Sequence, residues 1–336
     1  SRGLGDVYKR QGVSWNISGV RRDGWALAIA PQVLTRRLLR RGARYRHEKL
    51  FSRCWSPSIS RILKSNVFTM EELNLEPFVL NIKNGLNFRD LGGYKTKSGQ
   101  VIKSRKIIRS ARLSELSDDD LQYLADYGLT TDIDFRSPEE QAAEPDRYPE
   151  NTTYHFVPVF PTDETKSSEQ ADALQKSFSR DPHAGFENMV KTYADIVKMP
   201  SAQKAYRQFF DILLSHQEND GAVLFHCTAG KDRTGMGAVY LLSALGVDGH
   251  TIRQDYLATN DLIQPMVEKN LAAARKRGAT DALLANIRDL GTVSGAFLDS
   301  ALATIDAEYG NMHNYLKEAL QLTDAEKRDL RELYLQ

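Results

Sequence analysis

The chain has 336 residues, of which 41% are hydrophobic and 26% are charged, and its formal net charge at pH 7 is +1. These values are typical of an ordinary soluble globular protein that is long enough to bury a sizeable core. The two cysteines, Cys54 and Cys227, imply no disulfide framework and favour a reducing compartment. No apolar run is long enough for a membrane span, and no grouping of Cys and His has zinc-ligand spacing.

The charge is unevenly distributed along the chain. Residues 1–69 contain fifteen Lys or Arg and three acidic residues, a charge of +12, which leaves −11 for the rest. No methionine precedes Met70, and the opening SRGLGDVYKRQ resembles a translated sequencing adapter. We therefore expect residues 1–69 to be a non-native or disordered basic extension, and residues 70–336 to form a single domain. A basic arm that binds nucleic acid or an anionic membrane, or a targeting peptide, is the alternative interpretation.

From Met70 onward, short β-rich runs alternate with longer helical stretches, a pattern that indicates a layered α/β domain. The runs that favour strands are 101–110, 130–136, 153–159 and 222–227. The stretches that favour helices are 117–128, 186–198, 202–217 and 233–246, followed by a mostly helical C-terminal part.

Cap residues mark several of these helices. Ser117 precedes three acidic residues and Gly128 ends the same stretch, while Thr323 and Glu326 have the spacing of a capping box. Residues 164–190 begin with a polar, weakly periodic stretch, and we expect an insertion or a mobile lid there.

The stretch AVLFHCTAGKDRTGMG carries the most specific chemical signal. It places Cys227 at the end of a buried strand and Arg233 six residues later, at the start of a helix. A loop that leads into a helix N-terminus offers backbone N–H donors and the positive end of the helix dipole to a phosphoryl group. We expect the phosphate to be bound by the residues of this loop and the first two of the helix: Thr228, Ala229, Gly230, Lys231, Asp232, Arg233 and Thr234.

Four residues of this stretch have expected roles. Gly230 suits a backbone conformation that a Cβ would resist, and the planar guanidinium of Arg233 can hold two phosphate oxygens. The donors and cations that hold a phosphate dianion also favour a thiolate, so Cys227 is the expected nucleophile. Thr234 could donate its hydroxyl to the sulfur.

HCTAGKDRTG resembles the active-site loop of protein tyrosine phosphatases, H-C-x-x-G-x-x-R-[ST]-G. Its Lys and Asp before the Arg are similar to those of the bacterial family that includes mycobacterial protein tyrosine phosphatase B. The similarity extends through NFRDLGGY, IIRSARLSELSDDD, DIDFRSPEE and YLKEALQLTDAEKRDLRELYL, and so covers nearly everything after Met70. It implies a cysteine-dependent phosphatase fold, with a central, mostly parallel sheet flanked by helices, and no metal or organic cofactor.

A carboxylic acid is expected to protonate the leaving oxygen. In phosphatases of this general fold the acid follows a strand upstream of the cysteine, and VPVFPTDE is the matching place, which makes Asp163 the first candidate. Related enzymes have Phe-Pro-Asp, whereas Thr162 intervenes here. Asp232 is the second candidate, and Asp134 and Asp132 come third.

Other charged residues have structural alternatives. We expect His226 to make a structural hydrogen bond, because an ionised thiol needs no base. Lys231 is expected either to reach a second substrate phosphate at the mouth of the site or to be a solvated loop lysine. Arg89 is expected to form an ion pair that ties its segment to the core, and Asp134 to pair with Arg136.

The sequence thus predicts hydrolysis of phosphotyrosine monoesters through a thiophosphate on Cys227. Phosphoinositides or inositol phosphates are alternative substrates, and a catalytically silent phosphate-binding module is an alternative of another class. A nucleotide-binding loop is disfavoured, because Asp232 stands where Ser or Thr is required. We expect the protein to be cytoplasmic, or exported without a recognisable signal peptide.

Overall fold

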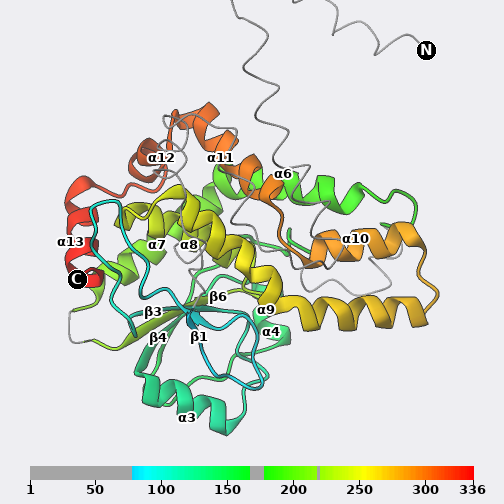
Figure 1. Ribbon diagram of the computed structural model, residues 1–336, viewed down its shortest axis with the longest axis horizontal. Helices are drawn as coiled ribbons and strands as arrows, with labels where there is room; N and C mark the ends of the chain where they lie inside the picture. The colour runs from blue at the N-terminus through cyan, green and yellow to red at the C-terminus, as the bar shows by residue number, and fades with distance from the viewer. Residues whose placement is uncertain (1–77, 167–177, 218–219) are drawn as a thin grey trace, which may run out of the picture. The chain divides into compact units, whose positions relative to one another are not determined.

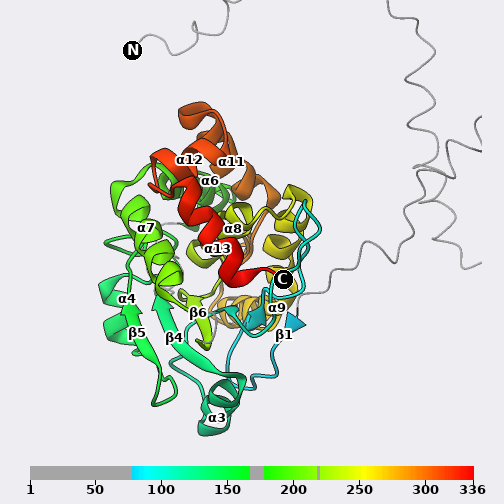
Figure 2. The ribbon, with the colours of Figure 1, turned by 90° about the vertical axis from the view of Figure 1, so that its left-hand side faces the viewer.

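The computed structural model describes residues 78–166, 178–217 and 220–336. The basic extension predicted for residues 1–69 lies outside these described residues. Within them, a mixed six-stranded sheet is packed between a single helix on one face and a much larger group of helices on the other (Figures 1 and 2). This arrangement confirms the predicted α/β class and the helical C-terminal part.

The sheet has the strand order β1-β2-β3-β6-β4-β5. Strands β3, β6, β4 and β5 are parallel, and β1 and β2 extend the β3 edge antiparallel. The strands are β1 Phe78–Val79, β2 Arg89–Asp90, β3 Ile107–Ser110, β4 Leu129–Asp134, β5 Thr153–Phe156 and β6 Ala222–His226. The predicted mostly parallel sheet is therefore present, with β6 at its centre.

The helix α3 lies on one side of the sheet, and α6 to α13 lie on the other (Figures 1 and 2). Among the described residues, no helix combines the length and the apolar character needed to cross a membrane. The helices are α3 Asp118–Tyr127, α4 Pro138–Ala143, α6 Ala184–Lys198, α7 Pro200–Ser215, α8 Arg233–Leu245, α9 Gly249–Lys276, α10 Asp281–Gly291, α11 Gly295–Tyr309, α12 Met312–Glu318 and α13 Asp324–Tyr334.

The central strand β6 supplies both faces with apolar side chains. Ala222 and Leu224 belong to the smaller core against α3, whereas Val223 and Phe225 belong to the larger core under the other helices. Because side chains alternate along a strand, the apolar run from Ala222 to Phe225 buries both faces of β6. β6 is consequently held rigidly from both sides, and so is the point where it ends.

Two strands are markedly shorter than the sequence predicts. The strand expected over 101–110 is regular only in β3, because a turn with Arg105 at φ +63° interrupts it, and the Arg105 amide donates to Asp90. The strand expected over 153–159 stops at Phe156. Beyond it Val157 donates to the Asp134 carbonyl, and Pro158 has no N–H to continue the ladder.

The predicted helix caps are confirmed. Ser117 forms a capping box with Asp120, Gly128 ends α3 in the left-handed conformation at φ +91°, and Thr323 forms its capping box with Glu326. The predicted lid at 164–190 is only partly visible, since residues 167–177 lie outside the described ranges. Its last residues belong to α6, whose Met189 is buried in the core.

Candidate active site

The predicted loop lies at the carboxyl edge of the parallel strands. β6 ends at His226, Cys227 follows directly, and α8 begins at Arg233. β3 and β4 end at the same edge, with Ser110 and Asp134 both in register with His226. Ligands of open α/β sheets bind outside the carboxyl ends of the strands. The sheet and the N-terminus of α8 thus converge on the loop.

Gly230 has the conformation that the sequence predicts. Its φ is +66°, in the left-handed region, and a Cβ there would lie 2.2 Å from the carbonyl oxygen of Ser110. Both the backbone angle and the contact with β3 exclude a larger residue. The loop can therefore pass close to the sheet only because this position is glycine.

Arg233 is fully buried and is held by a carboxylate that the sequence analysis did not assign. Its Nη1 donates to Oε2 of Glu140 at 2.6 Å, and its Nη2 donates to Oε1 at 2.9 Å. Burial opposes ionisation of both groups. Hydrogen bonds and charge nevertheless lower the pKa of Glu140 to about 2 and raise the pKa of Arg233 well above its ordinary value. The two groups form a buried, fully ionised pair.

Two donors beside this pair are buried and unsatisfied. Nε of Arg233 and Oγ1 of Thr234 have no hydrogen-bond partner within the described part of the chain. Buried polar groups are nearly always paired, so such donors need a specific explanation. Glu140 binds the two Nη atoms of Arg233, so the Nε–H remains available as a donor. An anion in front of the loop would accept a hydrogen bond from this Nε–H.

The loop is deep as well as polar. Cys227 is only 1% exposed, and the Thr228 hydroxyl next to it donates to Glu140. A pocket of about 910 Å³ lies outside this point and is lined by Thr228 and Glu140 among others. The thiol is thus buried directly next to Thr228, a residue that lines this pocket.

Lys231 does not lie where the sequence analysis expected it. It is 1% exposed and donates to Asp232, so it is neither a solvated loop lysine nor a cation at the mouth of the site. Asp232 also accepts from the Tyr193 hydroxyl at 2.9 Å, and Tyr256 donates to that hydroxyl at 2.8 Å. Burial and the charge of Asp232 raise the pKa of Tyr193 well above its usual value, which keeps it a donor.

The two acid candidates therefore have different surroundings. Asp232 is buried under Lys231 and Tyr193. Asp163 has a side chain that is 11% exposed, and its Oδ1 lies 3.8 Å from Nη2 of Arg233. The neighbouring Thr165 donates to the same oxygen of Asp163 at 2.6 Å and accepts from Arg233 at 3.2 Å. Asp163 is thus brought to the Arg233 guanidinium from a separate segment.

His226 is part of a buried cluster of charges behind the loop. Its Nδ1 faces the Cys227 carbonyl at 3.2 Å, and its Nε2 lies 3.3 Å from both Asp132 and Asp146. Burial opposes the charge, but the carboxylates raise the pKa of His226 well above its usual value. The contact of Nδ1 with the Cys227 carbonyl agrees with the structural hydrogen bond expected of His226, and the part that His226 has in the reaction stays a prediction.

Within the described residues, three side chains of this cluster offer atoms that could bind a metal ion. Atoms of Asp132, Asp146 and His226 lie within 4.8 Å of one another. Arg136 already donates to Asp146, and it pairs with Asp134 at 2.8 Å as predicted. Arg136 and His226 thus bring positive charge to this acidic cluster, in which burial raises the pKa of Asp132.

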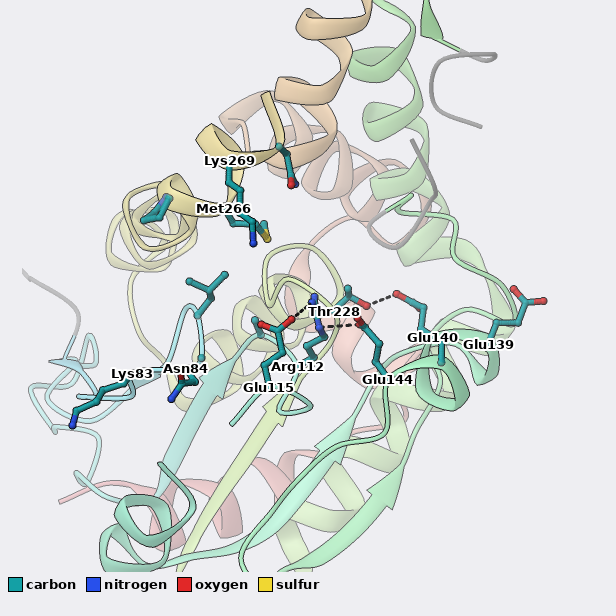
Figure 3. A pocket seen from close by; sticks show the side chains of 16 residues that line it. Lys83, Asn84, Arg112, Glu115, Glu139, Glu140, Glu144, Thr228, Met266 and Lys269 are labelled. Atoms are coloured by element: carbon teal, nitrogen blue, oxygen red, sulfur yellow. Dashed lines mark hydrogen bonds and ion pairs between the residues drawn. The ribbon is translucent and has the colours of Figure 1, made fainter. Parts of the chain in front are cut away.

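The side chains that line the pocket differ in charge and polarity (Figure 3). The α9 side carries Met266 and Lys269, and in Figure 3 the Lys269 side chain extends towards Arg112. Arg112 is held by Glu115 at 3.1 Å and by Glu144 at 2.9 Å. Lys83 and Asn84 lie on the opposite side, where Lys83 points outward. The entrance is therefore mixed in charge and partly apolar.

Glu140 is the main site residue that the sequence analysis missed. A signal was present: Ser137 and Glu140 have capping-box spacing at the start of α4, and the box forms, with the Ser137 amide donating to Glu140 at 2.8 Å. This interaction fixes the carboxylate where Arg233 meets it. A capping box indicates a helix start, but it does not indicate which distant cation the acid will bind.

Comparison with known proteins agrees with this geometry. A sequence model described as the tyrosine phosphatase family matches residues 80–336. A Cupriavidus necator protein, whose name assigns it to the tyrosine-protein phosphatases, is 31% identical over 243 residues, which cover 72% of this chain and 84% of that protein. The triple specificity protein phosphatase PtpB of Mycobacterium tuberculosis is 28% identical over 268 residues, 72% of this chain and 94% of its own.

A tyrosine-protein phosphatase of Nostoc commune is 30% identical over 219 residues, which cover 65% of this chain and 70% of that protein. The family match covers the strand, loop and helix that hold Cys227 and Arg233. The chain therefore belongs to the tyrosine phosphatase family, and it is a phosphoric monoester hydrolase of the protein tyrosine phosphatase type.

Proposed function

We propose that the protein hydrolyses phosphotyrosine monoesters through a covalent thiophosphate on Cys227. The observation that carries the proposal is the pair of buried donors without partners, Arg233 Nε and Thr234 Oγ1, at the N-terminus of α8. A phosphoryl group in front of the loop would accept from Nε and from the loop amides. The hydroxyl of Thr234 is then available to the sulfur.

In the first step, the Cys227 thiolate attacks phosphorus, the S–P bond forms, and the bond from phosphorus to the phenolic oxygen breaks. The leaving oxygen takes a proton from a carboxylic acid, so tyrosine departs neutral. In the second step, water attacks phosphorus, the S–P bond breaks, and the carboxylate takes the proton from that water. Inorganic phosphate leaves, and the thiolate and the acid are restored.

The geometry supports Asp163 as this acid. Its partly exposed carboxylate lies beside the Arg233 guanidinium, whereas Asp232 is buried and already accepts from Lys231 and Tyr193. An acid must come within hydrogen-bond reach of the leaving oxygen, which lies on the entrance side of the phosphate. Asp232 in this arrangement anchors the loop and balances the charge of Lys231.

The depth of the nucleophile supports an aryl phosphate. Because Cys227 is only 1% exposed, the phosphoryl group has to be brought inward to the sulfur, which favours a long side chain. Phosphotyrosine has the reach for this, and phosphoserine does not.

A phosphoinositide headgroup is the second candidate substrate. The pocket is lined by three cationic side chains, Lys83, Arg112 and Lys269, and cations bind phosphate oxygens well. One relative is named a triple specificity protein phosphatase. The fixed partners of Arg112 and the outward direction of Lys83 leave Lys269 as the main cation towards a second phosphate.

Hydrolysis of para-nitrophenyl phosphate by the full chain and by Cys227→Ser tests the mechanism. We expect loss of turnover in Cys227→Ser with retained binding of inorganic phosphate; equal rates would end the cysteine mechanism. Phosphate binding without turnover by the unmodified chain would instead support a silent binding module. A comparison of phosphotyrosine peptides with short-chain phosphoinositides, with and without Lys269→Ala, identifies the substrate class.

A further inference from the structure

Three consecutive carbonyl groups of the loop each accept a hydrogen bond from outside it. The Thr228 carbonyl accepts from the backbone amide of Arg112 at 3.1 Å. The Ala229 and Gly230 carbonyls accept from Nδ2 of Asn87, at 3.1 and 2.9 Å. These donors come from the segment before β2 and from the segment after β3, so the loop is held from the side of the sheet.

The orientation of the carbonyls determines where the amides point. No peptide bond among the described residues is cis, and in a trans peptide the C=O and N–H groups point in opposite directions. With the carbonyls of Thr228, Ala229 and Gly230 bound on the outside, the next three amides, up to Lys231, face the other way. That direction is the inside of the loop, where a phosphate would lie.

A buried group of charges holds these donors in place. Nη2 of Arg109 donates to the Gly230 carbonyl at 2.9 Å, while its Nη1 donates to Asp255 of α9 at 2.6 Å. Arg89 donates to Asp255 at 2.9 Å and also to Oδ1 of Asn87. We call Asn87, Arg89, Arg109 and Asp255 the carbonyl bracket. The pair between Arg89 and Asp255 confirms the ion pair predicted for the NFRDLGGY segment.

The carbonyl bracket carries a net positive charge next to the loop. Burial and the neighbouring Arg89 lower the pKa of Arg109 to about 10, and the two arginines overcome burial to lower the pKa of Asp255 to about 2. Arg109 and Asp255 are therefore both ionised at neutral pH. A carbonyl that accepts from a cation is polarised, and its peptide N–H becomes a stronger donor. Arg109 thus strengthens the Lys231 amide through the Gly230 carbonyl.

We propose that the carbonyl bracket is a positioning device for phosphate, which sets and polarises the loop amides without touching the substrate. This inference rests on the proposed function, because it assumes that the loop binds the phosphoryl group. It assigns a role to NFRDLGGY and to Arg109 of IIRSARLSELSDDD, which lie more than a hundred residues from Cys227 in the sequence. The bracket residues are positioning residues, since they act through hydrogen bonds to the loop carbonyls and to one another.

Asn87→Asp is the sharpest test. Aspartate has the same shape and tolerates the left-handed φ of +62° at this position, and it keeps an acceptor for Arg89. It removes both hydrogen bonds to the Ala229 and Gly230 carbonyls. In a Cys227→Ser background, we expect the dissociation constant for inorganic phosphate to rise by about tenfold to a hundredfold, the range for hydrogen bonds to charged groups.

Arg109→Lys is the second variant. Lysine keeps a positive charge that can pair with Asp255. It has no second nitrogen to donate to the Gly230 carbonyl, as Nη2 of Arg109 does. The matched control is Tyr94→Phe, which removes a 3.1 Å hydrogen bond to the same Asp255 and touches no loop atom. We expect weaker phosphate binding in Arg109→Lys and unchanged binding in Tyr94→Phe, with the thermal midpoint of each variant measured alongside.

The outcomes separate the two proposals. If Cys227→Ser itself does not bind inorganic phosphate, the proposed function fails and the inference fails with it. If Cys227→Ser binds phosphate and the folded Asn87→Asp and Arg109→Lys variants bind it equally well, only the positioning role is wrong. If Tyr94→Phe weakens binding as much as the two variants do, the effect belongs to general packing around Asp255, and the inference is again overturned.

Discussion

Glu140 accepts two hydrogen bonds from the guanidinium of Arg233, at 2.6 and 2.9 Å, with both side chains buried. This paired contact fixes the plane of the guanidinium, so its unpaired Nε–H keeps a single direction. It also links activity to stability, because removing one charge of a buried pair leaves the other without compensation.

Replacing Glu140 by Gln should reduce turnover of an aryl phosphate by about tenfold to a hundredfold, since one charged hydrogen bond is lost and the guanidinium can rotate. Steady-state kinetics with para-nitrophenyl phosphate measures this. Glu187→Gln, at an exposed position in the first turn of α6, is the control and should leave the rates unchanged. Full activity in Glu140→Gln would mean that Arg233 needs no fixed orientation.

The same pair should make stability depend on acid. The folded pKa of Glu140 is about 2, below the ordinary value of about 4.3, so its contribution is fully present above pH 4.3 and is lost as pH falls towards 2. Urea unfolding between pH 5 and 2.5 measures this. The decline in the free energy of unfolding should be less steep for Glu140→Gln than for the unmodified chain; identical slopes would exclude the ionised pair.

The two acid candidates can be separated with a substrate that has a poor leaving group. With phosphotyrosine, Asp163→Asn should lower turnover by about a hundredfold or more, because the phenolate then leaves without a proton. Glu164→Gln, which alters the adjacent carboxylate, should not. Asp232→Asn should mainly lower the thermal midpoint, since it removes the partner of buried Lys231. A larger loss of turnover in Asp232→Asn than in Asp163→Asn would reverse the assignment.

Two glycines with positive φ should respond differently to alanine. At Gly230, φ is +66° and the new Cβ would lie 2.2 Å from a backbone oxygen, so Gly230→Ala should displace the loop and abolish phosphate binding. At Gly246, φ is +93° with no atom within 4 Å, so the cost should be only the conformational strain, about 1–2 kcal/mol. Thermal melting and phosphate titration of both variants test this, and equal behaviour would contradict it.

The sequence predicted the features of this molecule that are local. The caps at Ser117 and Thr323, the left-handed Gly230 and the succession of β6, loop and α8 each depend on neighbouring residues, and each is present. The position of Cys227 at a strand end followed from the apolar run before it.

Features that depend on distant partners could not be predicted in the same way. Glu140 meets Arg233 across 93 positions of the chain, and Lys231 is buried because the rest of the fold surrounds it. No local pattern encodes such pairings. Resemblance to a family indicated the segments around these residues, but it did not indicate which side chains would meet.

The helix α9 contributes one residue to the support of the loop and another to the pocket. Near its start Asp255 belongs to the carbonyl bracket, and about 20 Å further along, at 1.5 Å per residue, Lys269 reaches the pocket. Between them Pro265 lacks a backbone N–H, so one backbone hydrogen bond of the helix is missing. A bend of α9 at Pro265 would move the end that carries Lys269 and leave Asp255, with the loop that it supports, in place.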